Sequence, residues 1–374
     1  MSNSQPYDAI LFVSFGGPEG PNDVVPFMEN VTRGRQIPRE RLVEVSAHYG
    51  LFGGVSPINA QNRDLIAALE LELRVHDLDL PVYWGNRNWQ PYLVDAMEAM
   101  RADGVKRALA FVTSAFSSYS GCRQYREDIE RARQTVGTDC PVVDKIRVFY
   151  NHPGFIEPMV DSTINALEAM RTRGVANPDL VFTAHSIPVS SAMSSDYVVQ
   201  LREACGLVAG GVSSRTGATQ PWVLVYQSRS GVPGTPWLEP DICDHLETRH
   251  HGGATGVVMV PIGFISDHME VVYDLDTQAR TRAEQLGLPV ERAATVGTDP
   301  RFVAMIRSLI EERIALADGC EPVRLCMGSR PASHDVCPPE CCPAPQRPQP
   351  GQPARGTPGS HGSDGVPSGA GPVN

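Results

Sequence analysis

The chain has 374 residues, of which 41% are apolar and 20% charged, a composition typical of a soluble globular protein long enough for two domains. Its net charge of −11 argues against nucleic-acid binding, which requires a surface rich in lysine and arginine. No apolar run approaches the roughly 20 residues of a membrane span, and the N-terminal residues lack the basic region of a signal peptide, so we expect a cytoplasmic protein.

Short apolar runs predict buried parallel strands along most of the chain. Amphipathic stretches with helical spacing lie between them, for example at residues 93–104 and 125–137. Strands that alternate with helices are typical of a mainly parallel α/β sheet with helices on both faces. The predicted strands are residues 9–15, 80–86, 107–116, 144–150, 179–186, 222–228 and 255–264.

We expect these elements to form two similar doubly wound, parallel-sheet domains of Rossmann-like type, with a cleft between them. The first domain is predicted at residues 1–112 and the second at residues 113–297. A helix at residues 298–316 is expected to pack back on the first domain. A cysteine-rich segment follows at residues 317–342. Residues 343–374 are nearly half proline and glycine and have few apolar side chains, which predicts disorder.

A histidine ends one of the predicted strands. His185 lies in the stretch FTAHSIP, and ligands of open α/β sheets bind beyond the carboxyl ends of the strands. An imidazole there can exchange a proton near neutral pH or bind a metal. The alternative is a buried histidine whose hydrogen bonds are satisfied beside the turn at Pro188.

An acidic stretch follows the strand at residues 255–264. A helix would place Glu270, Asp274 and Asp267 on one face, because they are spaced by four and three residues. Like charges on one face repel, so this row suggests the binding of a divalent cation or the acceptance of protons. The alternative is a solvated first turn stabilised by the helix dipole. Asp276 is expected to point elsewhere.

Arginine and hydroxyl side chains occupy several of the predicted loops. Arg33 and Arg87 suit bidentate binding of carboxylates, or are simply exposed cations. Ser56 and Tyr125 are candidate hydrogen-bond donors, or ordinary loop and cap residues. No dinucleotide-binding glycine motif, P-loop or Gly-x-Ser-x-Gly elbow follows a predicted strand, which disfavours dehydrogenase, NTPase and hydrolase activities.

Taken together, these segments resemble the ferrochelatase family. The matching stretches occur in family order over nearly all of residues 7–315: SFGGP, TRGR, GGVSPIN, YWGNRNWQP, FTAHSIP, YQSRSG, PWLEPD and PIGFISDHMEVVYDLD. The short form resembles the Gram-positive type, which uses coproporphyrin III rather than protoporphyrin IX. The resemblance implies a lyase that inserts Fe2+ into coproporphyrin III, giving coproheme in heme biosynthesis.

The resemblance also implies roles for the polar residues at the strand ends. His185 and Glu270 would face each other across the porphyrin and form the iron site, since imidazole nitrogen and carboxylate oxygen suit Fe2+. His185 is the expected acceptor of pyrrole protons, because its pKa lies near the working pH. Asp274 would continue the carboxylate row towards solvent as a path for metal or protons.

Four further positions match porphyrin-contacting positions of the family. Ser56 and Tyr125 are expected to contact the porphyrin, and Arg33 to lie near its propionates. Coproporphyrin has four carboxylates, so donors should surround the ring. Phe15 stands where some relatives have a tyrosine that can bind iron, so the product iron needs another axial ligand, with His185 as the candidate.

Five of the nine cysteines crowd the C-terminal segment, at residues 320–342, which favours metal or redox chemistry over disulfides in a cytosolic chain. Resemblance to ferrochelatases with a 2Fe–2S cluster implies the ligands Cys326, Cys337 and Cys342, completed by the internal Cys122. Several alternatives remain open: Cys341 in place of Cys342, Cys140 or Cys205 in place of Cys122, a set completed by Cys320, a zinc site, or free thiols.

The resemblance further implies a monomer that passes its product to a downstream enzyme of heme synthesis. Competing interpretations are a protoporphyrin IX ferrochelatase and a cobalt or nickel chelatase of related fold. A two-domain ligand-binding protein of the periplasmic type is the alternative outside enzymes, and it requires an export signal that the N-terminal sequence lacks.

Overall fold

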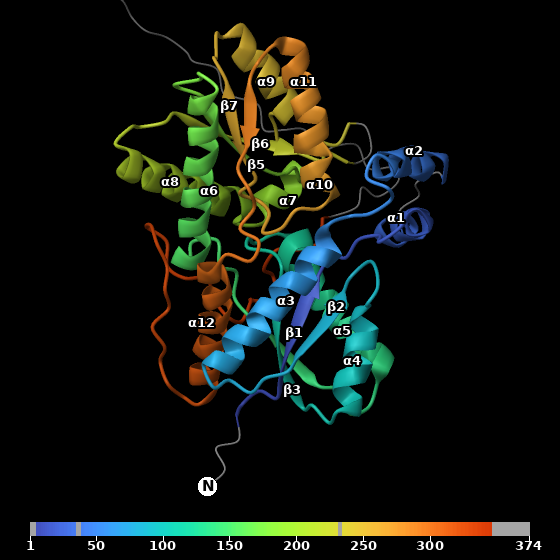
Figure 1. Cartoon of the computed structure of the whole chain (residues 1–374). Helices are drawn as coiled ribbons and strands as arrows, with labels where there is room; N and C mark the ends of the chain where they lie inside the picture. Colours follow the sequence, from blue (N-terminus) through green and yellow to red (C-terminus); the bar gives the residue numbers. More distant parts are fainter. Residues whose placement is uncertain (1–4, 35–38, 231–233, 346–374) are drawn as a thin grey trace, which may run out of the picture. The chain divides into compact units, whose positions relative to one another are not determined.

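The framework of the protein is a pair of four-stranded parallel sheets, seen in a computed structural model that describes residues 5–34, 39–230 and 234–345 (Figure 1). The strand order is β2-β1-β3-β4 in one sheet and β6-β5-β7-β8 in the other. Both orders are the same permutation, so the predicted fold class of two similar doubly wound units is confirmed. The strands are β1 (Ala9–Ser14), β2 (Val82–Asn86), β3 (Arg107–Val112), β4 (Val142–Lys145), β5 (Asp179–His185), β6 (Trp222–Gln227), β7 (Val257–Val260) and β8 (Val290–Arg292).

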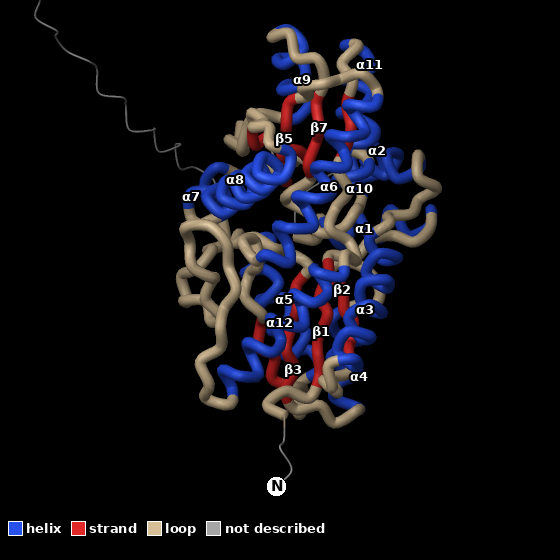
Figure 2. Tube along the Cα trace, turned by 60° about the vertical axis from the view of Figure 1, so that its left-hand side comes forward, coloured by secondary structure: helices blue, strands red, loops and turns tan. Residues whose placement is uncertain are grey.

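Helices flank both sheets (Figures 1 and 2). Those that follow the first strands are α1 (Val24–Val31), α2 (Arg39–Gly50), α3 (Ile58–Val75), α4 (Leu93–Ala102) and α5 (Gln124–Val136). The later ones are α6 (Pro153–Thr172), α7 (Val189–Met193), α8 (Tyr197–Thr216), α9 (Ile242–His251), α10 (Met269–Val272), α11 (Arg280–Leu286) and α12 (Pro300–Ala317).

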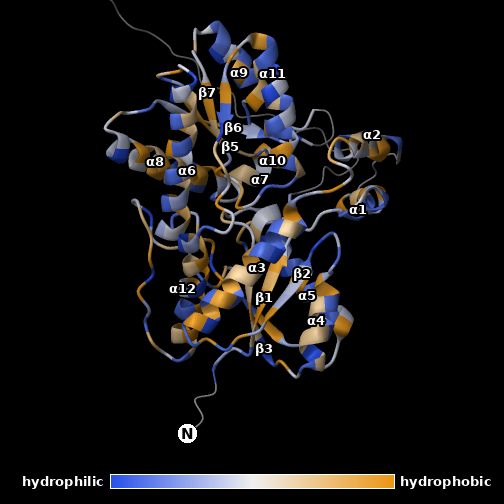
Figure 3. Ribbon diagram, viewed as in Figure 1, coloured by the Kyte–Doolittle hydropathy of each residue, from blue (hydrophilic) through white to orange (hydrophobic). Residues whose placement is uncertain are grey.

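The alternation of side chains along each strand sends them into two separate cores. In β1, Ala9, Leu11 and Val13 pack with α4 and α5, whereas Ile10 and Phe12 pack with α3 and α12. The side chains of β5 and β7 alternate in the same way. Those on one face pack with α9 and α11, and those on the other face pack with α6 and α8. Figure 3 shows the resulting hydrophobic strands and the mixed hydropathy of the surrounding helices. Such continuous apolar strands require a helix layer on each face.

An aromatic group joins the two halves. Phe149 stacks on Phe111 of β3 with ring centroids 5.5 Å apart, and it meets Phe155 of α6 and Phe302 of α12 edge to face at 6.0 and 5.9 Å. All four rings are fully buried. The C-terminal helix α12 therefore lies in a core shared by both halves, and its Arg307 also pairs with Glu72 of α3 at 2.8 Å.

The predicted division after residue 112 does not agree with the sheets. Strand β4, at residues 142–145, pairs with β3 and belongs to the first sheet. The apolar run at 144–150 suggested a strand of the second unit, but its residues Ile146–Tyr150 are buried as irregular chain beyond β4. The short edge strand β8 was missed, because only Val290 of its three residues is buried.

The cysteine-rich segment lies within the same compact unit as the two sheets, which extends to Ala344. The predicted disordered tail lies almost wholly outside the described residues, which end at 345.

Candidate active site

Loops from the two halves meet where the strands end. The backbone N–H of Asp267, after β7, donates to Gln61 Oε1 of α3 at 2.8 Å. Met269 of α10 packs in one apolar group with Phe27 of α1 and Tyr49 of α2. Because the order of each sheet reverses between its first and third strands, the ends of β5 and β7 are the place where a ligand is expected.

His185 is the last residue of β5. Its main-chain carbonyl accepts a hydrogen bond from the Tyr197 hydroxyl at 3.0 Å, and its Nδ1 contacts the carbonyl of Ser186. The Nδ1 contact fixes the ring, so Nε2 points away from the backbone. The imidazole is therefore oriented by its own strand end and by α8.

Glu270 reaches the same place from the segment after β7. Gly263 in this segment lies so close to β5 that a Cβ atom there would come within 2.8 Å of the Cα atom of Ala184, so only glycine fits. His268 then caps α10 by accepting the N–H of Glu270 at 3.2 Å. The side-chain amide of Gln227 donates to the Glu270 carbonyl. Glu270 is thus held in the first turn of α10.

The two side chains form an ion pair with His185 Nε2 3.4 Å from Glu270 Oε1. Burial alone would lower the pKa of His185, but the Glu270 carboxylate outweighs it and raises this pKa to about 9. Burial alone would raise the pKa of Glu270, but His185 outweighs it and lowers this pKa to about 2. At neutral pH the pair is an imidazolium and a carboxylate, both partly exposed.

Asp274 lies close enough to Glu270 and His185 for their charges to affect its pKa. It begins the π-helical turn Asp274–Ala279, a distortion that often marks functional sites. Burial, together with the charge of Glu270, raises the pKa of Asp274 to about 7, although its hydrogen bond from Ser228 acts in the opposite direction. Its carboxyl group therefore gains and loses a proton near neutral pH.

Asp267 does not join the carboxylate row. The helix begins only at Met269, so the carboxylate of Asp267 turns to Arg292, with both oxygens 3.2 Å from guanidinium nitrogens. Asp276 accepts from the same guanidinium at 2.8 Å, and so points elsewhere, as predicted. Of the three carboxylates in the predicted row, Glu270 and Asp274 are the two that interact with His185.

Three buried tyrosines lie close enough to Glu270 for its charge to affect their pKa values, and two of them were not predicted. Tyr49 of α2, Tyr125 of α5 and Tyr197 of α8 have pKa values raised by burial and, to a smaller extent, by Glu270. The value for Tyr125 is about 12. No local sequence signal distinguishes Tyr49 and Tyr197 from core aromatic residues, because their position depends on how distant helices pack.

The predicted porphyrin contacts lie at different places around the strand ends. Ser56 is buried, with its backbone N–H bonded to the carbonyl of Pro18 at 2.9 Å. Phe15 follows β1 and meets Phe27 edge to face at 6.2 Å. Arg33 is exposed, with its guanidinium 2.6 Å from the Asn30 side chain.

Tyr125 is accompanied by Arg87, the loop arginine after β2. The guanidinium carbon lies 5.3 Å from the centre of the phenol ring, and its Nε lies 2.8 Å from Asp128. Arg87 is thus held partly buried beside the phenol, rather than being the freely exposed cation of the alternative interpretation.

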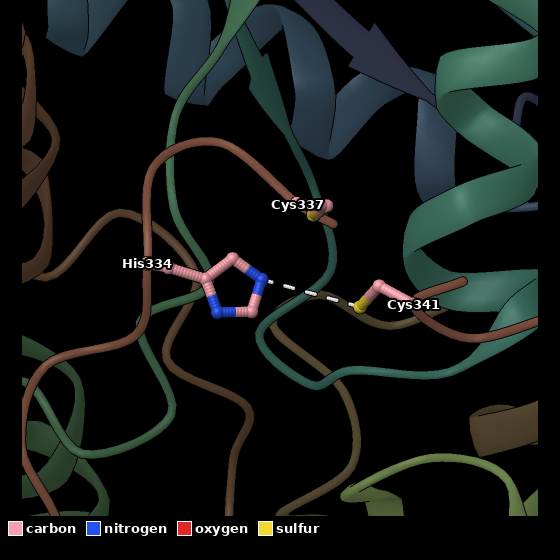
Figure 4. Close-up of side chains that lie close together, drawn as sticks. All are labelled: His334, Cys337 and Cys341. Atoms are coloured by element: carbon pink, nitrogen blue, oxygen red, sulfur yellow. Dashed lines mark hydrogen bonds between the residues drawn. The ribbon is translucent and has the colours of Figure 1, made fainter. Parts of the chain in front are cut away.

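A group of thiols gathers far from this pair in sequence. Cys122, in the π-helical turn Tyr119–Arg123, is in hydrogen-bonding contact with Cys337, and this contact outweighs burial and lowers the Cys122 pKa to about 5. The ligand atoms of Cys337, Cys341 and His334 all lie within 4.8 Å of one another (Figure 4). Cys341 Sγ is 3.6 Å from Cys342 Sγ. The predicted ligands Cys122, Cys337 and Cys342 therefore belong to one group, which we call the thiol group, together with Cys341 and His334.

Cys326, the fourth predicted ligand, does not lie with the thiol group. It is exposed, as is Cys320, and no contact within the described residues joins either of them to the thiol group. Cys140 and Cys205, the alternatives to Cys122, lie elsewhere: Cys140 contacts Met97, and Cys205 is buried in α8. Of the internal cysteines named as candidates, Cys122 is the one that contacts Cys337, and Cys341 lies with Cys337 where Cys326 does not.

The segment that carries the thiol group is bound to the folded core through its backbone. Met327 N donates to the Asn151 carbonyl at 2.8 Å, and the backbone N–H of Arg330 donates to Glu203 at 3.0 Å. Arg123, next to Cys122, donates to the carbonyls of Pro339 and Cys341 at 2.9 and 3.2 Å. These hydrogen bonds hold the C-terminal segment against the folded core.

Comparison with known proteins agrees with the arrangement at the strand ends. Residues 7–314 match the ferrochelatase family model. The chain belongs to the ferrochelatase family. The resemblance seen in the sequence motifs over residues 7–315 is thereby confirmed, and the cysteine-rich segment lies beyond the residues that this family model matches.

Several ferrochelatase relatives are similar over most of their length. The coproporphyrin III ferrochelatase of Streptomyces coelicolor is 55% identical over 355 residues, which cover 91% of this chain and 95% of the relative. The ferrochelatase of Rhodopirellula baltica is 52% identical over 345 residues, with the same coverage of 91% and 95%. The sirohydrochlorin chelatase of Bacillus subtilis subspecies spizizenii is a distant structural match, with a TM-score of 0.48 and 10% identity over 83% of this chain and 97% of that one.

The described part of this ferrochelatase contains no helix that is both long and apolar enough to cross a membrane.

Proposed function

We propose that this protein inserts Fe2+ into coproporphyrin III and releases its iron complex, coproheme, as a step of heme biosynthesis. Membership of the ferrochelatase family supports metal insertion, and the names of relatives such as the one from Streptomyces coelicolor support the porphyrin. The observation that carries the proposal is the His185–Glu270 pair, 3.4 Å apart at the carboxyl ends of β5 and β7.

The pair supplies an imidazole nitrogen and a carboxylate oxygen, a donor combination that suits Fe2+. In the metal-free protein the site is occupied by a proton, since the pKa of His185 is raised to about 9 chiefly by Glu270 acting against burial. Insertion therefore requires that His185 first lose this proton, after which its Nε2 can accept a pyrrole proton or contact the metal. This revises the expectation that the pKa of His185 lies near the working pH.

Asp274 is the group that we assign to the removal of protons. Its carboxyl group has a pKa of about 7, raised chiefly by burial, so it can accept a proton and return it to solvent near neutral pH. Ser228 holds it in place. We assign Asp274 to the path between the His185–Glu270 pair and water.

We assign Ser56, Tyr125 and Arg33 to binding the carboxylates of coproporphyrin, with Phe15 against the ring. Arg33 and Arg87 offer the guanidinium groups that bind carboxylates in a bidentate manner. Phe15 has no oxygen ligand, so the product iron takes an axial ligand from elsewhere, for which we propose His185.

Steady-state assays of the full chain with coproporphyrin III and protoporphyrin IX test the porphyrin assignment. We expect a clearly higher kcat/KM for coproporphyrin III with Fe2+. A higher value for protoporphyrin IX would overturn the choice of porphyrin, and faster insertion of Co2+ or Ni2+ into either porphyrin would overturn the choice of metal. Porphyrin binding without any insertion would support a ligand-binding protein instead.

We also propose that the thiol group holds a 2Fe–2S cluster. Such clusters require four ligands, and Cys122, Cys337, Cys341 and Cys342 provide four thiols in one place. The cluster would tie the C-terminal segment to the π-helical turn Tyr119–Arg123, which leads into α5.

Zinc is the rival occupant, because it too binds four thiolates. Protein produced with adequate iron and purified without oxygen should contain iron and sulfide and absorb visible light, whereas d10 zinc gives no colour. Substitution of Cys337 by serine should bleach the protein. Zinc without iron and sulfide would overturn this proposal.

From the sequence we further propose a cytoplasmic monomer that passes coproheme to a downstream enzyme of heme synthesis. Size-exclusion chromatography with light scattering tests the oligomeric state, and a dimer at micromolar concentration would contradict it.

A further inference from the structure

The thiol group contains one donor more than a 2Fe–2S cluster needs. Besides its four cysteines it includes His334, whose Nε2 lies 4.0 Å from Cys341 Sγ. His334, Cys337 and Cys341 are the three residues of the described chain whose potential ligand atoms lie within 4.8 Å of one another (Figure 4). Cys342 is outside this triple, although it is next to Cys341.

The imidazole of His334 is held in this position by its two neighbours in the chain. Arg324 donates to the carbonyl of Ser333 at 2.6 Å and pairs with the carboxylate of Asp335 at 2.9 Å. One guanidinium thus forms a clamp on both sides of His334, through the backbone carbonyl of Ser333 and the carboxylate of Asp335. The same guanidinium lies 3.8 Å from Glu312 of α12, so the clamp is anchored on the folded core.

The four cysteines differ in their exposure. Cys122 and Cys342 are 4% exposed, whereas Cys341 is partly exposed and His334 lies on the outer side of the group. The buried side of the thiol group therefore consists of the thiols of Cys122 and Cys342. On its exposed side, the imidazole of His334 faces the thiol of Cys341. An iron atom at the outer edge would meet both.

We propose that His334 is a ligand of the cluster, so that the set is three cysteines and one histidine, with one cysteine of the Cys341–Cys342 pair outside it. This inference rests on the proposed cluster. Histidine ligation at an iron–sulfur cluster replaces a charged thiolate by a neutral imidazole, which makes the cluster easier to reduce. It also brings a nitrogen nucleus into direct contact with iron.

The experiment uses the full chain purified without oxygen, with iron and sulfide determined for each variant. Pulsed EPR of the reduced protein measures nitrogen coupling, and a redox titration followed by visible absorption measures the midpoint potential. The variants are His334→Cys, which keeps a ligand of the other type, and His334→Ala, which removes it. His251→Ala, at an exposed position of α9, and Cys326→Ser, an exposed thiol outside the group, are the matched controls.

We expect the unmodified protein to show the strong nitrogen coupling of a directly bound imidazole. His334→Cys should keep its iron, lose this coupling and shift the potential downward. His334→Ala should also lose the coupling, and any cluster that it keeps by recruiting the spare cysteine should show the same lowered potential. Both controls should match the unmodified protein. Cys341→Ser and Cys342→Ser then identify the cysteine outside the set, which is the one whose loss leaves the iron content unchanged.

Two results would contradict the inference and are distinguishable. A 2Fe–2S cluster without strong nitrogen coupling, and with an unchanged potential in His334→Cys, would overturn the role of His334 and leave the cluster standing. Protein without iron and sulfide would overturn the cluster, and the ligand role of His334 with it.

Discussion

The imidazole of His185 and the carboxylate of Glu270 lie 3.4 Å apart, so neither group titrates as it would alone. Burial opposes charge on both side chains, yet their mutual attraction outweighs it and keeps both charged at neutral pH. The metal-free site is therefore neutral as a pair. If the pair is the iron site that we propose, an entering divalent cation would exchange with the imidazolium proton, which would link metal binding to proton release.

Substitution of His185 by alanine should lower metal insertion at least about 100-fold, the usual size of the loss when a proton-transfer group is removed. The fold should persist, because the side chain lies at the surface end of β5 and is partly exposed. Insertion rates and thermal unfolding of both proteins measure this. His251→Ala, at an exposed site, should retain full activity, and near-normal turnover of a folded His185→Ala protein would rule out the assignment.

Asp274 and Asp276 offer a matched pair within one acidic stretch. Asp274→Asn removes a carboxyl group whose pKa is raised to about 7, chiefly by burial. We expect kcat to fall roughly 10-fold or more, which is at the low end of the losses seen when a proton-transfer group is removed. Asp276→Asn should leave kcat nearly unchanged, because its carboxylate binds Arg292 at 2.8 Å and not the site. Equal losses of kcat in the two variants would contradict a specific role of Asp274.

At the scale of single elements, two helices have a histidine that caps their N-terminus. His268 and His152 both use Nδ1 to accept a backbone N–H, at the beginning of α10 and α6 respectively. Such a cap requires a neutral ring, because a protonated imidazole has no acceptor. Burial, with Arg147 nearby, lowers the pKa of His152 to about 4.

The cap of α6 predicts a pH dependence of stability. The unfolded chain binds a proton at His152 below its ordinary pKa of 6.5, whereas the folded protein does so only near pH 4, so the free energy of unfolding falls as the pH decreases from 6.5 to 4. His152→Asn keeps an acceptor and removes the titration. We expect its curve to be flatter by at most about 3 kcal/mol across this window, since one pKa unit corresponds to about 1.4 kcal/mol.

Urea denaturation between pH 4 and pH 7.5 measures this difference for both proteins. His251→Asn serves as the control, because that residue is exposed at the end of α9. Parallel curves for the unmodified protein and His152→Asn would show that His152 does not titrate in the predicted way.

At the scale of the whole molecule, the C-terminal segment completes the folded core. The fully buried Arg147 pairs with Glu312 of α12 at 2.8 Å and also donates to the carbonyl of Leu325 at 3.0 Å. Glu203 accepts the N–H groups of Ser329 and Arg330, both at 3.0 Å. Removal of the segment would take one hydrogen-bond partner from Arg147 and two from Glu203, although Arg147 would keep Glu312 and Glu203 would keep Tyr150.

Two truncations test this role. A chain that ends at Ala317 should lose about 3 kcal/mol or more of its free energy of unfolding, since each of several hydrogen bonds contributes about 1 kcal/mol. It should also lack the proposed cluster. A chain that ends at Ala344 should match the full chain in stability and iron content, because the sequence beyond it has few apolar side chains. Equal stability of the two truncated chains would contradict the role of the segment.

The sequence by itself determined the elements and the chemistry of the strand ends. Apolar runs such as residues 9–15 encode strands buried on both faces, and the motifs around His185 and Glu270 identify the family. These features are local, because periodicity and motif spacing depend on neighbours along the chain. Local pattern failed at the edges of the sheets, where β8 has only one buried residue and where β4 could belong to either half.

Only the tertiary structure decided which groups meet. The pairing of Arg292 with Asp267, the effect of the Glu270 charge on Tyr49 and Tyr197, and the contact of Cys122 with Cys337 all join segments that are separated in sequence. The positive charge of His185 also depends on the tertiary structure, because it is stabilised by Glu270, which lies in α10 and not in the strand that carries His185. Such contacts follow from the packing of helices against sheets, where geometry and burial, rather than spacing along the chain, determine which side chains lie side by side.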